Sequence, residues 1–504
     1  MSEENRDRLL QTSVLHARTV REKYMMALGY RSLKLRISEI REESDAEIRR
    51  LPHFDPRLTP RRRRIRRPSR PAFMRQPLLE EDEQDEYADE GETEDGRIQE
   101  EISTRVPKRF MSAGSMHSSV FNLSSAALGA GILSVPYAFR ESGFILGIGL
   151  MVLSAAVTIY SINLLVCCRD ETRLSSYEDL SVYCFGKRLS MIVDLSIILF
   201  CFGCGVAYIV ATHDILAPII RHQFPDHPLL HNKGLIMSVS VTAIMFPLSL
   251  VEKMSSLRFS SLLGVLSISY LVFAIVYDSA VGILSHGLPP LMHYAIRPGW
   301  SVFRALSIIM FAFTCQVNVF SIYTELQRPS IRRIRKVVRR STSITSVFYL
   351  LVGLFGFLKN LDQTSPDILY NYNLLQQPII GVAQVAMGVT LALAFPFNIY
   401  PCRFTIEMSL FPDAKPSRVR FHFLTFAIVY LSLLVAIFAP SLDKVFSLLG
   451  STTSSVVSFI LPALFYLHIF PGRWSRRDRI GALTLLISGC LLCVIGTTVE
   501  LLSS

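Results

Sequence analysis

The chain has 504 residues, of which half are hydrophobic and only 18% are charged. This composition excludes an ordinary soluble domain, in which about a quarter of the residues are charged. The formal net charge of +11 comes from basic residues that collect in particular segments of the sequence. The charge therefore does not indicate a nucleic-acid partner, and we expect none.

The first 110 residues differ in character from the rest of the chain. They carry the basic run RRRRIRRPSR (61–70) and an acidic stretch after it, and they lack the apolar content for a core. We predict a disordered cytoplasmic tail over residues 1–110, with a tail-binding protein as a candidate partner. A nuclear-localisation signal is the alternative for the basic run, but the apolar segments that follow argue against it. No cleavable signal peptide is expected in so charged a region.

From Ser112 onward, apolar segments of about 20 residues recur, the length that crosses a hydrocarbon core of about 30 Å. Each is a predicted transmembrane helix, and together they indicate an all-α polytopic protein in a lipid bilayer, expected to be a monomer. The eleven predicted helices cover residues 117–138, 144–167, 189–215, 234–250, 259–284, 301–323, 342–358, 379–400, 421–439, 444–469 and 480–502.

The loops between these segments predict the orientation, because Lys and Arg collect on the cytoplasmic side. With a cytoplasmic amino terminus, the cytoplasmic loops hold 21 basic residues, seven of them in QRPSIRRIRKVVRR (327–340). The opposite loops hold six basic residues. The asymmetry favours this orientation, which places the carboxyl terminus on the other side.

The spans divide into two similar halves within a transporter domain predicted over residues 111–504. Spans one to five cover 117–284, spans six to ten cover 301–469, and the helix 480–502 is extra. Because each half has an odd number of helices, the halves enter the membrane in opposite senses, as in an inverted repeat. Transporters of this kind bind substrate at the midplane, between one interrupted helix from each half.

Span one contains a stretch that is weak for a helix, NLSSAALGAGILSVPYAF (122–139). Glycine costs about 1 kcal/mol in a helix interior and proline about 3. If residues 128–131 unwind, the half-helix that follows offers free N–H groups and a positive dipole end to an anion such as a carboxylate. Small residues in membrane helices more often serve close packing, which is the alternative for Gly129 and Gly131.

Span six has a matching weakness, which favours the binding interpretation. Both spans begin alike, with SSVF at 118 and WSVF at 300, an offset of 182 residues. The same offset carries Gly129–Gly131 to 311–313, directly before TCQVN (314–318), the most polar stretch of span six. The sequence therefore predicts two helices interrupted at the same depth.

The stretch SVFNLSSAALGAGILSVPYAF closely resembles the first-helix signature of the amino acid/auxin permease family. It is most similar to the sodium-coupled neutral amino acid transporters and their protozoan, fungal, plant and vacuolar relatives. Three further stretches agree at corresponding places: FAFTCQVNVFSIYTEL (311–326), VTLALAFPFNIYP (389–401) and GSTTSSVVSFILPALFYL (450–467). The resemblance covers all but the amino-terminal tail. It implies two inverted five-helix repeats with helices one and six broken, one extra helix, and amino acid transport against a cation gradient.

The resemblance also implies roles for individual residues. Asn122 and Thr390 match the pair associated with sodium coordination, and Ser125 stands where sodium-coupled members usually have a second asparagine. The segment CQVNVFSIY lacks a histidine that is common in the neutral-amino-acid carriers, so proton coupling is the alternative to sodium. Residues whose backbone or side chain would contact the substrate are Gly129, Ala130, Gly131, Ile132, Tyr208, Cys315, Gln316 and Asn318. Tyr208 comes from its position and not from the resemblance: in the outer half of span three, its hydroxyl is a candidate to bond a substrate carboxylate, and ordinary helix packing is an equal alternative.

These features predict a secondary active transporter for neutral amino acids that works by alternating access, with sodium or a proton as coupling ion and no other cofactor. No carboxylate is placed clearly at the midplane, which disfavours a guanidinium substrate. The pair His213–Asp214 is either a proton relay or reaches the interface. An amino acid-sensing receptor that signals through the tail is the alternative function. No phosphate-binding loop or catalytic cluster is present, so we expect no enzyme activity.

The sequence leaves two candidate membranes. RQPLLEED (75–82) resembles a dileucine-type sorting signal, and YRSL (30–33) resembles a tyrosine-based one. Both favour an endolysosomal or vacuolar membrane, with the plasma membrane as the alternative.

Overall fold

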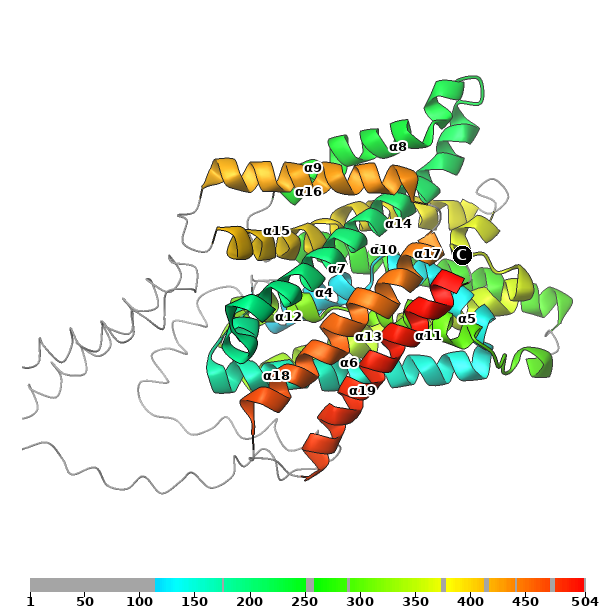
Figure 1. The fold of residues 1–504 in the computed structure, drawn as a ribbon. Helices are drawn as coiled ribbons and strands as arrows, with labels where there is room; N and C mark the ends of the chain where they lie inside the picture. Colours follow the sequence, from blue (N-terminus) through cyan, green and yellow to red (C-terminus); the bar gives the residue numbers. More distant parts are fainter. Residues whose placement is uncertain are drawn as a thin grey trace, which may run out of the picture. The chain divides into compact units, whose positions relative to one another are not determined.

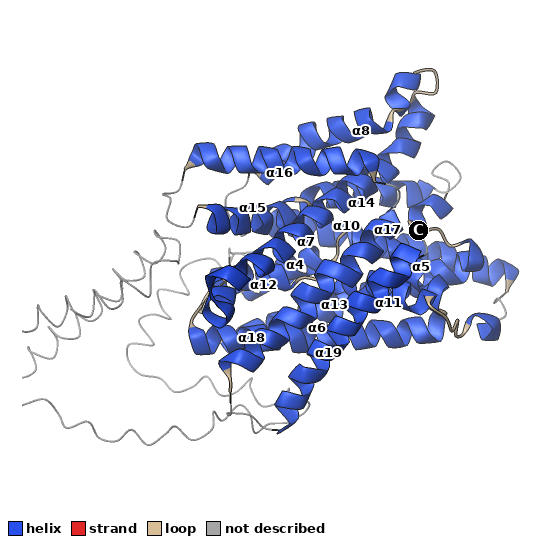
Figure 2. Cartoon of the chain, in the orientation of Figure 1, coloured by secondary structure: helices blue, strands red, loops and turns tan. Residues whose placement is uncertain are grey.

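The computed structural model describes residues 114–502, apart from 175, 251–257, 288–290, 373–377, 412–416, 440–441 and 472–475. The chain separates into two units, Met1–Phe110 and Met111–Ser504, and every described residue belongs to the second. The predicted tail and both sorting signals lie outside the described residues. The described part consists of helices and their connections, without a strand (Figure 2).

The first half of the fold begins with a broken helix and ends with a long continuous one (Figure 1). Its elements are α4 (Met116–Ala127), η3 (Ala130–Ser134), α5 (Val135–Ser142), α6 (Phe144–Thr172), α7 (Tyr177–Gln223), η4 (Pro228–His231), α8 (Lys233–Ser240), η5 (Val241–Met245), α9 (Phe246–Ser249) and α10 (Arg258–His286). Helix α7 is bent at Gly186, whose φ of 74° suits a residue without a side chain.

The second half repeats this plan, and one further helix follows it. Its elements are η7 (Leu291–Tyr294), α11 (Ser301–Phe313), α12 (Gln316–Glu325), α13 (Ile331–Asn360), η8 (Leu361–Gln363), η9 (Ile368–Asn371), α14 (Pro378–Ala394), α15 (Pro396–Leu410), α16 (Arg418–Phe438), α17 (Leu442–Leu449), η10 (Gly450–Ser454), η11 (Val456–Ile460), α18 (Leu461–Ile469) and α19 (Arg476–Leu502).

Fewer than eleven of the described helices meet the length and hydropathy that a membrane span requires. Among the described residues, nine helices are long and apolar enough to cross a membrane, and the bent pair Met116–Ala127 and Ala130–Ser142 makes a tenth. The predicted fourth span, 234–250, corresponds to a shorter apolar helix, Lys233–Ser249. It contains a π-helical segment, η5, and it is shorter than the roughly 20 residues that a hydrocarbon core requires. The count of eleven is therefore not confirmed.

The contacts between helices reproduce the predicted inverted repeat. Helix α10, the fifth span, packs against α4 of the first span and α13 of the seventh. The tenth span repeats these contacts, because α17 packs against α11 of the sixth span and α18 packs against α6 of the second. The fifth span thus contacts the first and the seventh, and the tenth contacts the sixth and the second. The fifth span and its counterpart, the tenth, therefore have equivalent neighbours, as a fold with two equivalent halves requires.

The outer surface of the bundle carries large apolar side chains where a soluble protein would carry polar ones. Val152 on α6, Phe273 on α10, Phe438 on α16 and Val494 on α19 are between 59% and 78% exposed. Apolar residues that face outward along helices of this length are typical of a lipid-facing surface.

The described helices end at two faces of the bundle, a basic face and an opposite face. The basic face contains the helix ends and connections near residues 169–176 and 325–340, where Gln327 N–H donates to the Gly114 carbonyl at 2.7 Å. The opposite face contains residues 140–143, 294–301 and 361–372, where Arg297 N–H donates to the Ser142 carbonyl at 2.9 Å. Helices α5 and α11 extend from the two interruptions to the opposite face, and α4 and α12 extend to the basic face.

Candidate functional site

The first interruption separates α4 from α5 by a short stretch that is not α-helical. Leu128 (φ −73°, ψ 61°) and Gly129 (φ −99°, ψ −149°) leave the helical region, and the helix axis bends by 49°. The 3₁₀ segment η3 follows and leads into α5, which carries Pro136 in its first turn. Proline costs little there, because the N–H that it lacks has no helical partner. The predicted break is therefore present, and it uses its glycine and proline where each is tolerated.

Tyr208 of α7 lies directly against this interruption. Its hydroxyl contacts the backbone of Ala130 and the side chain of Asn398 on α15. A methyl group added to Gly129 would overlap the Tyr208 hydroxyl. Tyr208 therefore does more than fill space: it binds the backbone that the sequence predicted for a carboxylate, and it requires glycine at position 129.

Gly131 has a packing role that the sequence offered as the alternative. A Cβ atom at this position would lie 3.0 Å from both Cα and Cβ of Ala312, closer than side chains normally approach. The glycine therefore allows η3 to touch the end of α11. Close packing and a binding role are compatible here, because the contact brings the two interruptions together.

Tyr349 of α13 joins the two interrupted helices to each other. Its hydroxyl lies 2.6 Å from the carbonyl oxygen of Ala127 and 2.9 Å from that of Ala312. These carbonyls are near the carboxyl ends of α4 and α11, where helical N–H donors run out. One hydroxyl thus stabilises both broken ends, and Tyr349 is fully buried.

The second interruption, between α11 and α12, is made with polar side chains. Thr314 has an extended backbone (φ −75°, ψ 104°), and Cys315 N–H donates to Gln316 Oε1 at 2.9 Å. Ser458 of η11 donates to the same Oε1 at 3.0 Å and lies 3.2 Å from Thr314 Oγ1. The predicted polar stretch TCQVN therefore contains the break, and the tenth span supports it.

Three buried carboxamides near the interruptions have atoms without a hydrogen-bond partner among the described residues. These are Asn122 Oδ1 on α4 and, on α12, Gln316 Nε2 and Asn318 Oδ1. The three residues are 5%, 0% and 3% exposed. Leaving a buried polar atom unpaired costs about 1–3 kcal/mol, so such atoms indicate a place where a polar ligand, ion or water binds.

Two of the residues predicted for cation coupling, Ser125 and Thr390, lie against the same position of α10. A Cβ atom at Gly264 would lie 3.5 Å from Ser125 Oγ and 3.4 Å from Thr390 Cγ2. Asn122 is one turn before Ser125 and shares its face of α4. The Thr390 hydroxyl lies 2.9 Å from the Ala386 carbonyl of its own helix. Amide and hydroxyl oxygens without a carboxylate suit a hard monovalent cation. Across the described part of the chain, no cluster of three His, Cys, Asp or Glu residues could hold a metal ion.

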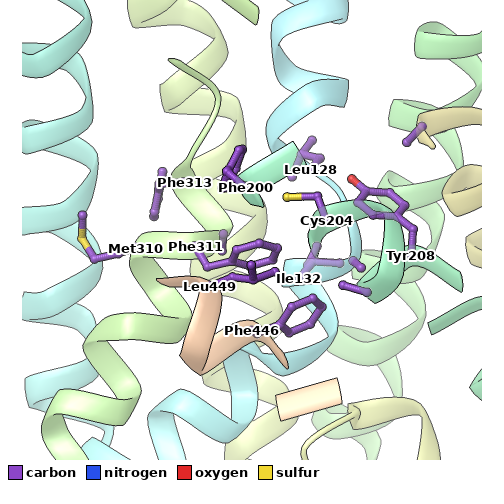
Figure 3. Packing of buried hydrophobic residues seen from close by; sticks show 14 of the residues in the cluster. Leu128, Ile132, Phe200, Cys204, Tyr208, Met310, Phe311, Phe313, Phe446 and Leu449 are labelled. Atoms are coloured by element: carbon purple, nitrogen blue, oxygen red, sulfur yellow. The ribbon is translucent and has the colours of Figure 1, made fainter. Parts of the chain in front are cut away.

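Large apolar side chains pack together beside the two interruptions. Figure 3 shows Ile132, Phe311, Phe446 and Leu449 lying together beside the break. The rings of Phe311 and Phe446 are stacked with centroids 4.6 Å apart, and Phe200 is tilted against Phe311 at 6.4 Å. Ile132 is completely buried. Its side chain is therefore part of this apolar cluster, and its predicted contact with the substrate stays a prediction.

The structure gathers most of the predicted substrate residues, with one difference for Cys315. Its side chain belongs to a separate apolar cluster with Val120, Leu123 and Ile162, so only its backbone faces the second interruption. The sequence did not indicate Tyr349, Asn398 or Ser458. Ser458 stands in the serine- and threonine-rich start of GSTTSSVVSFILPALFYL (450–467), one of the stretches that resemble the family. A single Tyr or Asn in an apolar helix gives no such signal.

Comparison with known proteins identifies the family. Residues 112–502 match the family described as "Transmembrane amino acid transporter protein". This chain belongs to that family. The expected relationship is therefore confirmed, and so is the expectation that the protein is a transporter and not an enzyme.

Relatives of this transporter include plant and yeast proteins. The chain is 29% identical over 411 residues to the Arabidopsis thaliana protein "Amino acid transporter AVT6A", covering 77% of this chain and 88% of the relative. It is 28% identical over 393 residues to "Vacuolar amino acid transporter 5" of Schizosaccharomyces pombe, covering 76% and 92%. These names give no support to the receptor interpretation.

Solved structures share the fold of this transporter at low sequence identity. Mhp1, a nucleobase-cation-symport-1 family transporter in a closed conformation with bromovinylhydantoin bound, is 16% identical with a TM-score of 0.53, covering 78% of this chain and 91% of its own. A manganese transporter of Eremococcus coleocola is 13% identical with a TM-score of 0.51, covering 77% and 85%. The predicted fold class, an all-α transporter with an inverted repeat, is confirmed.

Proposed function

We propose that this chain is a secondary active transporter that carries neutral amino acids by alternating access, coupled to sodium or a proton. The observation that carries the proposal is the pair of interruptions, at matching positions of the two halves, with unpartnered carboxamide atoms beside them. A carrier needs such a site between its halves, because relative movement of the halves then exposes it to either side.

The chemistry of the two interruptions suits a zwitterion. The amino end of the η3–α5 segment offers backbone N–H groups and a positive dipole end, which favour a carboxylate. The carboxyl ends of α4 and α11 offer carbonyl oxygens, which favour an ammonium group. The predicted side-chain contacts, Tyr208, Gln316 and Asn318, carry no charge. A neutral amino acid matches this arrangement without leaving a buried charge unpaired.

A single coupled cation supplies enough energy for accumulation. Moving one charge through 100 mV yields about 2.3 kcal/mol, which corresponds to roughly fortyfold accumulation at 1.4 kcal/mol per decade. Asn122, Ser125 and Thr390 would hold sodium if sodium is the ion. With protons, a titratable group elsewhere in the pathway has to carry the charge.

The membrane that we propose is vacuolar or endolysosomal. The proposal follows from the name of the yeast relative and from the dileucine-like segment at 75–82. The plasma membrane is the alternative. Fluorescence localisation of the full chain, with and without replacement of Leu78 and Leu79 by alanine, separates the two.

A flux assay in reconstituted vesicles tests the function. Labelled amino acids from a panel are offered while sodium and pH are varied separately on each side. We expect uptake of neutral amino acids driven by one of the two ions, and loss of uptake in Gly131→Leu. Gly149→Leu is the matched control, because Gly149 on α6 has open space around it. Absence of flux for the whole panel, or full flux in Gly131→Leu, would contradict the proposal.

A further inference from the structure

A buried carboxyl group lies in the connection between α13 and α14, on the opposite face. Asp367 directly precedes η9 and is 2% exposed. Its Oδ1 accepts the backbone N–H of Leu369 at 2.9 Å, whereas its Oδ2 has no hydrogen-bond partner among the described residues. An ionised carboxylate with a buried, unsatisfied oxygen is costly, and the substrate site does not explain it.

Gln384 of α14 brings a second unpartnered acceptor to the same turn. Its Nε2 donates to the Leu369 carbonyl at 3.1 Å, which fixes the orientation of the carboxamide. Its Oε1 is buried without a partner in the described part of the chain. Asp367 thus binds the N–H of Leu369, and Gln384 binds the carbonyl of the same residue. The Asp367 Oδ2 and the Gln384 Oε1 are left without a hydrogen-bond donor among the described residues. A proton on Asp367 provides an O–H donor, which the ionised form lacks.

The electrostatic surroundings also favour the protonated form. Burial raises the pKa of Asp367 to about 7, and the like charge of Asp214 on α7 adds to the effect. Asp214 itself lies 2.9 Å from His213 Nδ1 and contacts Tyr370. No described residue forms an ion pair with Asp367. Other titratable or charged groups on the surrounding elements are Arg221, Tyr372, Lys359, Asp278, Asp362, Arg140, Glu141, Tyr294 and Arg297.

The connection rests directly on the first broken helix. Ser134, the last residue of η3, donates to the Pro366 carbonyl at 2.7 Å, and Arg140 of α5 donates to the Thr364 carbonyl at 3.0 Å. Ile368 is completely buried, and η9 contacts η3. Because η3 carries Gly131 and Ile132, the connection is linked to the candidate substrate site through η3.

We propose that Asp367 binds a proton from the compartment at the opposite face, and that this proton holds the connection 361–372 seated on η3. The inference rests on the proposed transport function. A proton passes from water or a buffer acid to Oδ2, and the resulting O–H group donates within the buried turn. Asp367 is a positioning residue, since it acts on the substrate site through the connection and η3.

The sign of the pH dependence follows from the two states of the connection. When it lifts, Asp367 is exposed to water and regains its ordinary pKa of 3.8. The seated state binds the proton more tightly, so low pH favours seating. Seating weakens as pH rises from about 4 to about 7 and then stays constant. An acidic compartment therefore keeps the connection seated on η3, and a neutral one releases it more readily.

Hydrogen exchange of the full-length protein in nanodiscs tests the proposal. The measured quantity is the protection of the amides of Leu369, Tyr370 and Tyr372, corrected for the intrinsic pH dependence of exchange. We expect protection to fall by up to about tenfold per pH unit between about pH 5 and pH 7 and then to level off. Asp367→Asn, whose carboxamide carries a donor at every pH, should give a flat and protected profile. Asp367→Glu should keep the slope.

Asp362→Asn is the matched control on the same connection. A hydrogen bond from Arg297 lowers the pKa of Asp362, so this exposed carboxylate stays ionised across the range and the wild-type slope should remain. A flat wild-type profile, or an unchanged slope in Asp367→Asn, would overturn the proposal. So would a protection change caused by sodium at constant pH that Asp367→Asn abolishes, because it would identify a metal-cation site.

The test stays decisive if one variant fails to fold, and it distinguishes failure of the proton site from failure of the transport function. If Asp367→Asn does not fold, the wild-type and Asp367→Glu profiles decide the question. Amino acid flux is measured separately at a single pH. Lack of flux with a titrating wild-type profile would contradict the transport function alone, whereas normal flux with a flat profile would contradict the proton site alone.

Discussion

The two interrupted helices lie at matching positions, but they are built with different chemistry. The first uses backbone: two glycines let Tyr208 and Ala312 approach the main chain. The second uses side chains: Gln316 and Ser458 support the break, and the Asn318 Oδ1 has no hydrogen-bond partner among the residues that the structure describes. Backbone groups suit the carboxylate and ammonium that all amino acids share, and side chains suit what differs among them. The first break should therefore control whether any amino acid is carried, and the second which one.

The largest effect should come from the first break. Gly129→Ala would place a methyl group on the Tyr208 hydroxyl and push η3 out of position. A misplacement of about 1 Å costs roughly hundredfold in rate, so we expect a loss of about that size for every substrate, measured as initial uptake in vesicles. Gly149→Ala should be unchanged. A loss of uptake for some amino acids only would contradict the proposal that the first interruption binds what all amino acids share and the second sets selectivity.

Tyr349→Phe should weaken both breaks at once. The variant leaves the carbonyls of Ala127 and Ala312 without their shared donor, at a cost of about 1–3 kcal/mol. We expect a lower unfolding temperature in detergent and reduced uptake of all substrates. Tyr277→Phe is the control, since Tyr277 is 48% exposed on α10. Unchanged stability would show that the hydroxyl does not hold the two ends together.

Gln316→Leu should act on the second break and change selectivity. Cys315 N–H and Ser458 Oγ both lose their acceptor, and a net hydrogen bond is worth about 0.5–1.5 kcal/mol. We expect KM to rise by up to about tenfold, unequally among amino acids. The exposed Gln223→Leu should leave KM unchanged. An equal rise for every amino acid would contradict a selective role.

The smallest effect concerns the coupling ion. Thr390→Val removes one of the three predicted oxygen ligands, so sodium coupling predicts a rise of a few fold in the sodium concentration for half-maximal uptake, about 1 kcal/mol. Proton coupling predicts no change. Thr498→Val is the control, because its hydroxyl makes a similar bond within its own helix, at 2.7 Å to Val494, on the exposed side of α19. A sodium effect shared by both variants would argue against a specific ligand.

The sequence predicted the architecture because its main signals are local. Apolar segments, loop charges and the offset of 182 residues located both breaks to within a few residues. The fourth span is the exception: the predicted segment 234–250 is itself as short as the helix Lys233–Ser249, below the roughly 20 residues that a hydrocarbon core requires. The second break was predicted from polarity, and the structure places it at Thr314–Cys315.

The partners of the breaks could not be predicted from the sequence. Tyr349 lies 222 residues from Ala127 along the chain, and a buried tyrosine in an apolar helix resembles any other packed aromatic residue. The sequence did not single out Asp367, because an acidic residue in a loop is expected to be exposed to water. Only the packing of the connection onto η3 shows that it is buried. Long-range contacts of this kind depend on the folded arrangement.

The most direct test is an experimental structure of the full chain with a transported amino acid bound. The proposal predicts the ligand between the two breaks, with its carboxylate within hydrogen-bond distance of the N–H groups of η3 and its side chain toward Gln316 and Asn318. A ligand bound elsewhere in the bundle, with the space between the breaks filled by side chains alone, would contradict it.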